Sequence, residues 1–326
     1  MLRVAGAGPR IAGPANAARD PVHSGTTSDA RERKLEREQG MAATINNFTE
    51  KRFDTGVVEL NYAEGPNSGH PMVLIHGIGS RWQAWLPVIP HLSRRWKLFA
   101  VDLRGHGRSG RVSGRYVFAD YPPDISAFVT GVIGEPAVLF GHSLGGMTAI
   151  GVAADAGQTV RAAVLEDPPV FITERPEIST FRDRFATSHR IILETRGSDE
   201  IYRRLRETDT ESDSAVLRFR AESLSTLDPD VYAPSLEGRH REGFEVETKL
   251  GMIAAPTLLL QGNADLGGAV SDDDAARVMS ALSRGTLVKF ADVGHGIHSE
   301  RPEETVGAVE EFLARALPNA AARGGN

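Results

Sequence analysis

Short apolar runs recur along the chain from about residue 48 onward, and charged or glycine-rich segments separate them. The runs are continuous rather than alternating, so we expect both faces of each strand to be buried. Strands of this kind are typical of a mostly parallel sheet that helices cover on both sides. The expected strands are at 52–53 and 57–62, which form an opening hairpin, and at 72–75, 98–101, 137–140, 162–165, 257–260 and 286–290.

Segments with helical length and periodicity connect these strands. The expected helices are at 82–92, 125–133, 144–156, 272–282 and 303–316. Because strands and helices alternate along the chain, the pattern predicts an α/β fold with a doubly wound, mostly parallel sheet.

One long interval, between Asp167 and Ala255, breaks the alternation. It contains no convincing buried strand, only charged amphipathic segments at 178–194, 200–207 and 213–224. Open α/β folds bind ligands at the carboxyl ends of their strands, so we expect this insertion after the sixth strand to form a helical lid there. The predicted organisation is an α/β core at 41–167 and 251–318 with a helical cap at 168–250.

The first forty residues differ from the rest of the chain. They are rich in Gly, Ala, Pro and Arg, they lack a sustained apolar run and they end in a cluster of charges. We therefore expect a disordered tail at 1–40, which matches neither a secretory signal nor a transit peptide. Met41 is a candidate start of the protein, and we expect a flexible carboxyl end at 319–326.

The composition argues against several classes of partner and site. A formal net charge of −6 and a pI of about 6.0 indicate no nucleic-acid partner and no anionic membrane, because both need a concentrated basic surface. No apolar run approaches the roughly 20 residues that span a bilayer. The chain has no cysteine, which removes disulfides, thiolate metal sites and cysteine nucleophiles and fits a cytoplasmic location.

The strand expected at 137–140 leads into a candidate nucleophile. It is followed by Gly141-His142-Ser143-Leu144-Gly145, a GxSxG sequence, and then by a helix rich in small residues. Such a sequence sets the serine on a tight turn between strand and helix, where glycines avoid collisions with neighbouring elements. A serine attacks a carbonyl only when a base removes its proton and a third group orients that base.

Two later loops supply a candidate acid and a candidate base. Asp265 lies in the loop after 257–260, and His295 lies in the loop after 286–290. The order of serine, acid and histidine along the chain is the one expected of this fold, and each residue follows a predicted strand. The sequence therefore predicts that Ser143, Asp265 and His295 meet at the carboxyl edge of the sheet.

Together these motifs resemble those of the α/β-hydrolase family over about residues 48–316. The matching segments are His76-Gly77-Ile78-Gly79, Asp102-Leu103-Arg104-Gly105-His106-Gly107-Arg108-Ser109, the serine turn, the acid and histidine loops, and Glu300-Arg301-Pro302-Glu303. The resemblance implies that Ser143 is the nucleophile, that His295 is the general base and then the acid, and that Asp265 holds the imidazole. It also implies an oxyanion hole made by the backbone N–H groups of Ile78 and Leu144.

Two of these roles have competitors. His298 competes with His295, but the glycine before His295 matches the family motif. Asp167 follows the sixth strand, from which some family members supply the acid, but two prolines come directly after it and we prefer Asp265. The candidate substrate contacts are His76, Gly77, His142 and Trp82.

The resemblance implies a serine hydrolase that cleaves a carboxylic ester of a small molecule, or a lactone or thioester, through an acyl-enzyme that water then hydrolyses. No metal and no cofactor are expected, since the sequence has neither a nucleotide-binding motif nor a plausible cluster of metal ligands. Within the fold the alternatives are a cofactor-free perhydrolase or haloperoxidase and a C–C bond hydrolase, which usually carries asparagine in place of His142. A small-molecule receptor with slow or no turnover is the alternative of another class.

Overall fold

The computed structural model describes residues 47–66, 69–172, 179–210 and 212–317. The expectations for the tail at 1–40, for Met41 and for the carboxyl end at 319–326 lie outside the described residues. Within the described ranges, no helix combines the length and the apolar character that crossing a membrane requires.

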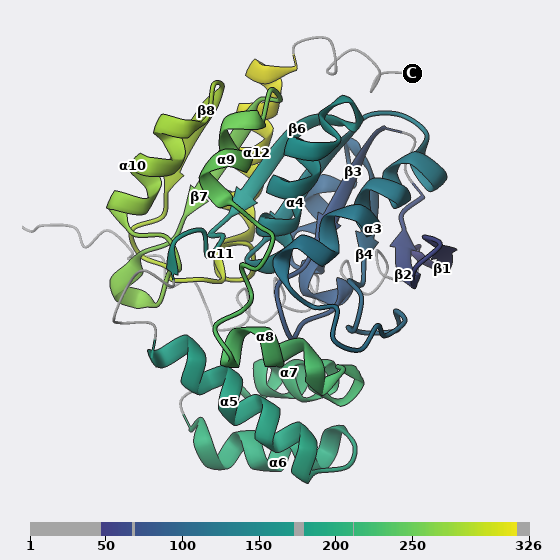
Figure 1. Ribbon diagram of the computed structural model, residues 1–326, viewed down its shortest axis with the longest axis vertical. Helices are drawn as coiled ribbons and strands as arrows, with labels where there is room; N and C mark the ends of the chain where they lie inside the picture. The colour runs from purple at the N-terminus through teal and green to yellow at the C-terminus, as the bar shows by residue number, and fades with distance from the viewer. Residues whose placement is uncertain (1–46, 67–68, 173–178, 211, 318–326) are drawn as a thin grey trace, which may run out of the picture. The chain divides into compact units, whose positions relative to one another are not determined.

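Eight strands form one sheet, in the order β1-β2-β4-β3-β5-β6-β7-β8 (Figure 1). Their bounds are β1 Thr49–Asp54, β2 Glu59–Glu64, β3 His70–Ile75, β4 Trp96–Val101, β5 Ala137–His142, β6 Val160–Glu166, β7 Thr257–Gln261 and β8 Gly285–Lys289. The first two strands form an antiparallel hairpin and β2 is antiparallel to β4, whereas all other neighbours are parallel. The predicted α/β fold with a mostly parallel sheet is confirmed.

Helices and helical turns connect the strands. Those of the core are η1 Trp82–Trp85, α2 Ile89–Leu92, η2 Phe118–Asp120, α3 Tyr121–Phe128, η3 Val129–Ile133, α4 Leu144–Asp155, η4 Gly157–Thr159, η8 Ala264–Leu266, α10 Asp272–Ala281, α11 Ile297–Glu300 and α12 Pro302–Ala316. Those between β6 and β7 are α5 Ser179–Glu194, α6 Ser198–Thr208, α7 Ser214–Thr226, η7 Pro229–Tyr232, α8 Ala233–Leu236 and α9 Val246–Met252.

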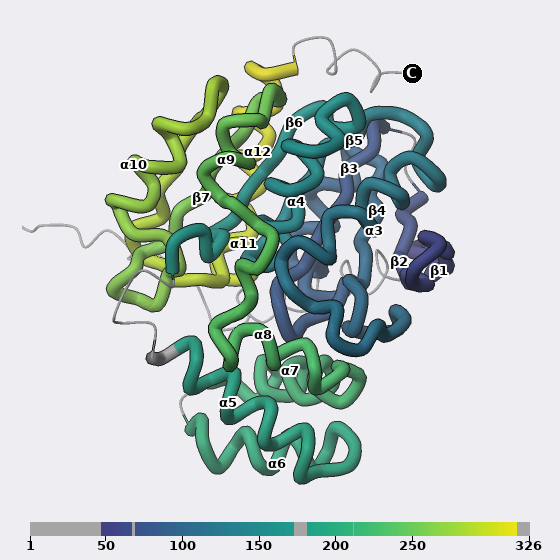
Figure 2. The backbone as a smooth tube through the Cα atoms, in the orientation of Figure 1, coloured from purple at the N-terminus to yellow at the C-terminus, as the bar shows by residue number. Residues whose placement is uncertain are grey.

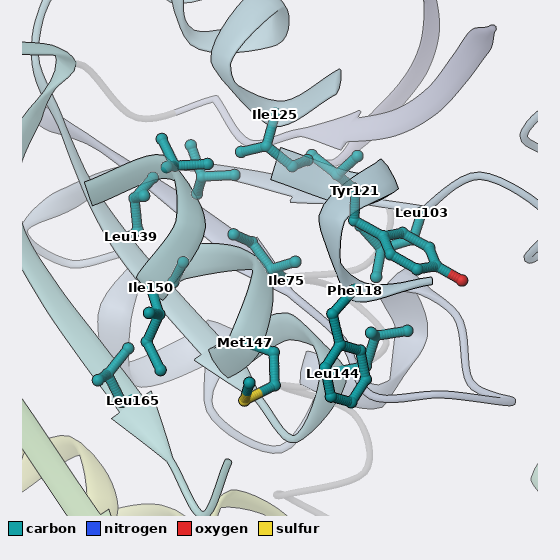
Figure 3. Close-up of a cluster of buried hydrophobic side chains, with 14 of the residues drawn as sticks. Ile75, Leu103, Phe118, Tyr121, Ile125, Leu139, Leu144, Met147, Ile150 and Leu165 are labelled. Carbon is teal, nitrogen blue, oxygen red and sulfur yellow. The ribbon is translucent and has the colours of Figure 1, made fainter. Parts of the chain in front are cut away.

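Two apolar layers cover the sheet, because successive side chains of a strand point to opposite faces. Along β3, Val73 and Ile75 belong to one buried cluster, and Met72 and Leu74 belong to the other. The first layer includes α3 and α4, whose side chains lie against the sheet in Figure 3. The second includes η1, α2 and α12. Burial on both faces explains why the strand sequences are continuously apolar.

Two of the predicted helices differ from the expectation because of proline. The helix expected at 82–92 is divided into η1 and α2, since Pro87 lies between them and Pro90 opens α2. Proline lacks the N–H that a continuous helix needs. The helix expected at 125–133 instead begins as α3 at Tyr121, with prolines in its first turn, where no N–H is needed. It ends in the π-helical turn η3 and Gly134, which has a φ of 73°.

The insertion between β6 and β7 is helical, as the charged amphipathic pattern predicts. Its helices α5, α6, α7 and α8 lie together at one end of the sheet (Figures 1 and 2). In contrast, α9 lies against the core, because ion pairs of 2.8 Å from Lys249 to Asp155 and 2.6 Å from Arg277 to Glu247 join it to α4 and α10. A lid function for the insertion stays a prediction.

Candidate active site

The serine turn between β5 and α4 has the strained geometry that GxSxG predicts. Ser143 has a φ of 53° and a ψ of −116°, which residues other than glycine rarely adopt. A Cβ on Gly141 would overlap the carbonyl of Gly145, and one on Gly145 would overlap the carbonyl of Ile75. Only glycine therefore fits on either side of the serine, and the strained turn holds Ser143 at the start of α4.

His295 lies in the loop after β8 and is paired with a buried acid. Its Nδ1 donates to Asp167 Oδ2 at 2.7 Å; the His295 side chain is 22% exposed and that of Asp167 is fully buried. Asp167 directly follows β6 and has a φ of 43°. Its carboxylate also accepts backbone N–H groups of Gly262 at 3.2 Å, Ala269 at 2.5 Å and Val270 at 3.2 Å. Four donors therefore fix this carboxylate beneath the imidazole.

The expectation that Asp265 holds the imidazole is wrong, because the structure brings Asp167 to His295 instead. Asp265 lies in η8 and is exposed, and its own N–H donates to Asn263 Oδ1 at 2.9 Å. The loop at 262–270 turns the N–H groups of its two ends toward Asp167, so its middle, with Asp265, lies on the outer side. The competing acid that we named is thus the one in contact.

A second histidine–carboxylate pair, which the sequence analysis missed, lies beside the first. Glu166 is fully buried at the end of β6, and His298 Nδ1 lies 2.8 Å and 2.9 Å from its two carboxylate oxygens. The backbone N–H of His298 also donates to Glu166 at 2.9 Å. Burial alone would raise the pKa of Glu166, but His298 and His142 together hold it below its ordinary value. The sequence did contain a signal for this second pair: two histidines three residues apart, His295 and His298, and two consecutive acids, Glu166 and Asp167.

His142 lies between the two pairs. Its ring centroid is 4.6 Å from that of His295 and 5.1 Å from that of His298. Its Nε2 donates to the backbone carbonyl of His295 at 2.8 Å, which leaves Nδ1 without a proton in the neutral ring. Burial lowers the pKa of His142 to about 3, so the ring is neutral near pH 7.

The loop after β3, at 76–79, is fixed by two neutral histidines. His76 Nδ1 donates to Gly77 O at 2.7 Å and its Nε2 accepts the N–H of Leu103 at 3.1 Å. His106 Nε2 accepts the N–H of Gly79 at 3.1 Å. Burial lowers the pKa of His76 to about 4 and that of His106 to about 3, and both rings are inaccessible to solvent. They therefore shape the loop that carries Ile78.

Two of the candidate substrate contacts are structural residues. His76 is fully enclosed by the loop that it supports, and it does not line the cavity described below. Trp82 donates its backbone N–H to Asp102 at 2.7 Å and stacks on Phe48, away from that cavity. The expectation of substrate contact is therefore wrong for His76 and Trp82. Gly77 and His142 do line the cavity, so for them it stays a prediction.

A cavity of about 960 Å³ lies over the serine turn. Ser143, His295, Ile78 and Leu144 all line it, together with apolar side chains of the core and of α5 and α7. The loop after β3 approaches the nucleophile so closely that a Cβ on Gly77 would lie 3.1 Å from Ser143 Cβ. Within the described ranges, no three histidine, aspartate or glutamate side chains are grouped to hold a metal ion.

Comparisons with known proteins agree with this geometry. A family model described as "Alpha/beta hydrolase family" matches residues 72–308. The chain is 37% identical over 129 residues to 2-(acetamidomethylene)succinate hydrolase of Mesorhizobium japonicum, a match that covers 39% of this chain and 46% of the relative, slightly less than half of its length. It is 24% identical over 280 residues to 2-hydroxy-6-oxo-6-(2'-aminophenyl)hexa-2,4-dienoic acid hydrolase of Metapseudomonas resinovorans, which covers 82% of this chain and 92% of the relative.

A solved structure, that of E-2-(acetamidomethylene)succinate hydrolase, superposes with a TM-score of 0.67 and 26% identity. The superposition covers 82% of this chain and 99% of that one, so the likeness extends over both the core and the insertion. The family model alone spans more than half of the present sequence. The chain therefore belongs to the alpha/beta hydrolase family.

Proposed function

We propose that the protein is a serine hydrolase that cleaves a carboxylic ester of a small molecule through an acyl-enzyme. The observation that carries this proposal is the strained serine turn and the His295–Asp167 pair at one cavity. A lactone or a thioester presents the same acyl carbon and belongs to the same proposal. Water is the second substrate, and the mechanism needs no cofactor.

Each step uses a group that lines or supports the cavity. Because His295 Nδ1 donates to Asp167, the neutral ring has its lone pair on Nε2, which takes the proton of Ser143 as Oγ attacks the acyl carbon. The C–O bond to the leaving group breaks as His295 returns that proton to the alcohol. Water then attacks the acyl-enzyme with the same base, which releases the acid and restores Ser143.

The oxyanion of each tetrahedral intermediate would be held by the backbone N–H groups of Ile78 and Leu144. Leu144 is the first residue of α4, so its N–H has no partner within the helix, and the partial positive charge of a helix N-terminus favours an anion there. Ile78 lies in the loop that touches the serine turn. Each donor of this kind lowers the barrier by roughly 3 kcal/mol.

A graded series of 4-nitrophenyl esters, from acetate to octanoate, tests the proposal with wild type and Ser143→Ala in parallel. We expect multiple turnover in the wild type and a loss of at least about 10³-fold in kcat for Ser143→Ala. Ser235→Ala changes another serine of the cavity wall and should retain activity. Equal rates in wild type and Ser143→Ala, or no turnover by either, would refute the proposal.

A C–C bond hydrolase is the second candidate. It is favoured by the likeness to the hexadienoic acid hydrolase, which covers 92% of that relative. It would turn over vinylogous diketones and leave simple esters nearly untouched. A receptor, the candidate of another class, would bind such compounds without multiple turnover. The ester series therefore separates the serine esterase from the other two candidates, and multiple turnover of a vinylogous diketone separates the C–C bond hydrolase from the receptor.

A further inference from the structure

The charged side chains of the cavity wall are all of one sign. Among the described residues that line it, the fully charged ones are Arg182 and Arg184, both on α5, and no described aspartate or glutamate belongs to the lining. The remaining wall is formed by apolar, hydroxyl and imidazole side chains and by the carboxamide of Gln83. The insertion therefore contributes a positive charge to a cavity whose walls are otherwise mostly apolar.

A third arginine adds to this charge from behind the wall. Arg220 of α7 donates to Ser188 Oγ at 3.0 Å, and Ser188 is 2% exposed. Burial, and then the positive charge of Arg184, lower the pKa of Arg220, which places the two guanidinium groups within each other's field. Within the described residues, neither Arg184 nor Arg220 has a carboxylate at ion-pair distance.

Two other arginines of the insertion pair with carboxylates. Arg204 pairs with Glu194 at 2.9 Å, and Arg218, two residues from Arg220 on the same helix, pairs with Asp199 at 2.8 Å. Both pairs are exposed, where water already screens the charges. Arg182 and Arg184 are exposed arginines at the cavity wall, and Arg220 behind them is partly buried, where a positive charge is less well solvated and a bound anion would compensate it.

We propose that the substrate carries a carboxylate, which Arg184 binds with the help of Arg182 while the acyl carbon lies at Ser143. Guanidinium groups match the planar geometry of a carboxylate and bind it with two parallel hydrogen bonds. Arg182 keeps one nitrogen on the carbonyl of Leu236 at 3.0 Å, which holds it beside α8 and leaves its other donors available. This inference rests on the proposed function and names its substrate class: acyl compounds with a second, anionic group.

Two esters of the same length test it: 4-nitrophenyl hydrogen suberate, an anion, and its neutral methyl ester. We expect the wild type to prefer the anion in kcat/KM, and Arg184→Gln to lower kcat/KM for the anion by about tenfold or more, mainly through KM. The neutral ester should change by less than about twofold. Arg184→Lys should recover part of the preference, because it keeps the charge but not the bidentate geometry.

Arg190→Gln is the matched control, since Arg190 is an exposed arginine of the same helix outside the cavity wall and should leave both rates unchanged. Equal losses on the two esters in Arg184→Gln, or no preference for the anion in the wild type, would overturn the inference while the serine hydrolase stands. If no ester is turned over, calorimetric titration of Ser143→Ala with suberate decides the binding question separately. The inference is supported if Arg184→Gln, added to Ser143→Ala, weakens the binding of suberate and Arg190→Gln does not. Equal binding of suberate by Ser143→Ala and the two double variants refutes it.

Discussion

The two histidine–acid pairs at the end of β6 have the same chemistry and different surroundings. Asp167 and Glu166 are consecutive, and their partners His295 and His298 are three residues apart. The His295 side chain is 22% exposed at the cavity, whereas His298 is 5% exposed and stacks on Trp85 with centroids 4.4 Å apart. Both histidines line the cavity, but His295 is the more exposed of the two. The proposed function therefore assigns proton transfer to the first pair, and the deeper burial of the second suits a structural role.

The buried pair also supports the accessible one. Glu166 accepts both the ring N–H and the backbone N–H of His298, so it fixes the start of α11 against β6. That helix begins two residues after His295, and the carbonyl of His295 accepts a hydrogen bond from His142. The position of His295 is thereby set from both sides, by the fixed start of α11 and by His142.

The largest effect that separates the pairs is expected from Asp167→Asn. Asparagine keeps the shape but cannot hold His295 in the tautomer that leaves Nε2 free, so kcat for 4-nitrophenyl esters should fall by about 10⁴-fold. Asp265→Asn is the matched control, because Asp265 is exposed and should change kcat by less than about twofold. A large loss in the control with little loss in Asp167→Asn would mean that the acid comes from the loop after β7.

The sequence predicted Ser143 and His295 from local motifs, but it did not identify their acid. The carboxyl ends of β6 and β7 are neighbours, so an acid after either strand is available to the same histidine. What decides between them is the positive φ of Asp167 and the ring of N–H groups around its carboxylate, and neither has a signature in a single sequence. The strands were predictable because continuous apolar runs report burial on both faces.

The insertion also shows what a single sequence cannot predict. Its helices follow from amphipathic periodicity, but which arginines face the cavity depends on how α5 and α7 lie over the serine turn. Arg218 and Arg220 lie two positions apart on α7, so helix periodicity places them on opposite faces: one is exposed and paired, and the other is directed toward Ser188. Which of these faces meets the cavity is a tertiary property that helix periodicity leaves open.

A smaller effect on activity and a larger one on stability are expected from Glu166→Gln. The change leaves His298 without its buried charged partner, which should lower the free energy of unfolding by about 3–5 kcal/mol. Because the carboxylate of Glu166 binds His298 and not Ser143 or His295, kcat per folded molecule should fall far less than in Asp167→Asn. Urea denaturation measures the first quantity, and the ester assay corrected for the folded fraction measures the second.

His298→Asn tests the pair from its other side and should destabilise the protein to a similar extent. If both variants unfold like the wild type but lose as much kcat as Asp167→Asn, the second pair takes part in the chemistry, and the contrast between the two pairs is lost.

The smallest effect is on how the free energy of unfolding depends on pH. It comes from His142, whose ring lies between the two pairs. The pKa of His142 is about 3 in the folded protein and near 6.5 in an unfolded chain, so between these values the unfolded state binds a proton that the folded state does not. Stability therefore falls as the pH is lowered through 6.5, with a slope of about 1.4 kcal/mol per pH unit from this ring. At pH 5 its contribution should be a loss of about 2 kcal/mol.

His142→Asn removes this titration but keeps a side chain that can donate to the carbonyl of His295. Urea denaturation of wild type and variant at pH 7 and pH 5 should show a decrease on acidification that is about 2 kcal/mol smaller in the variant. His76 and His106 titrate in the same sense and remain in both proteins, so they cancel in the difference. Equal decreases would mean that His142 takes up its proton in the folded state as well, which would place a positive charge between the two pairs.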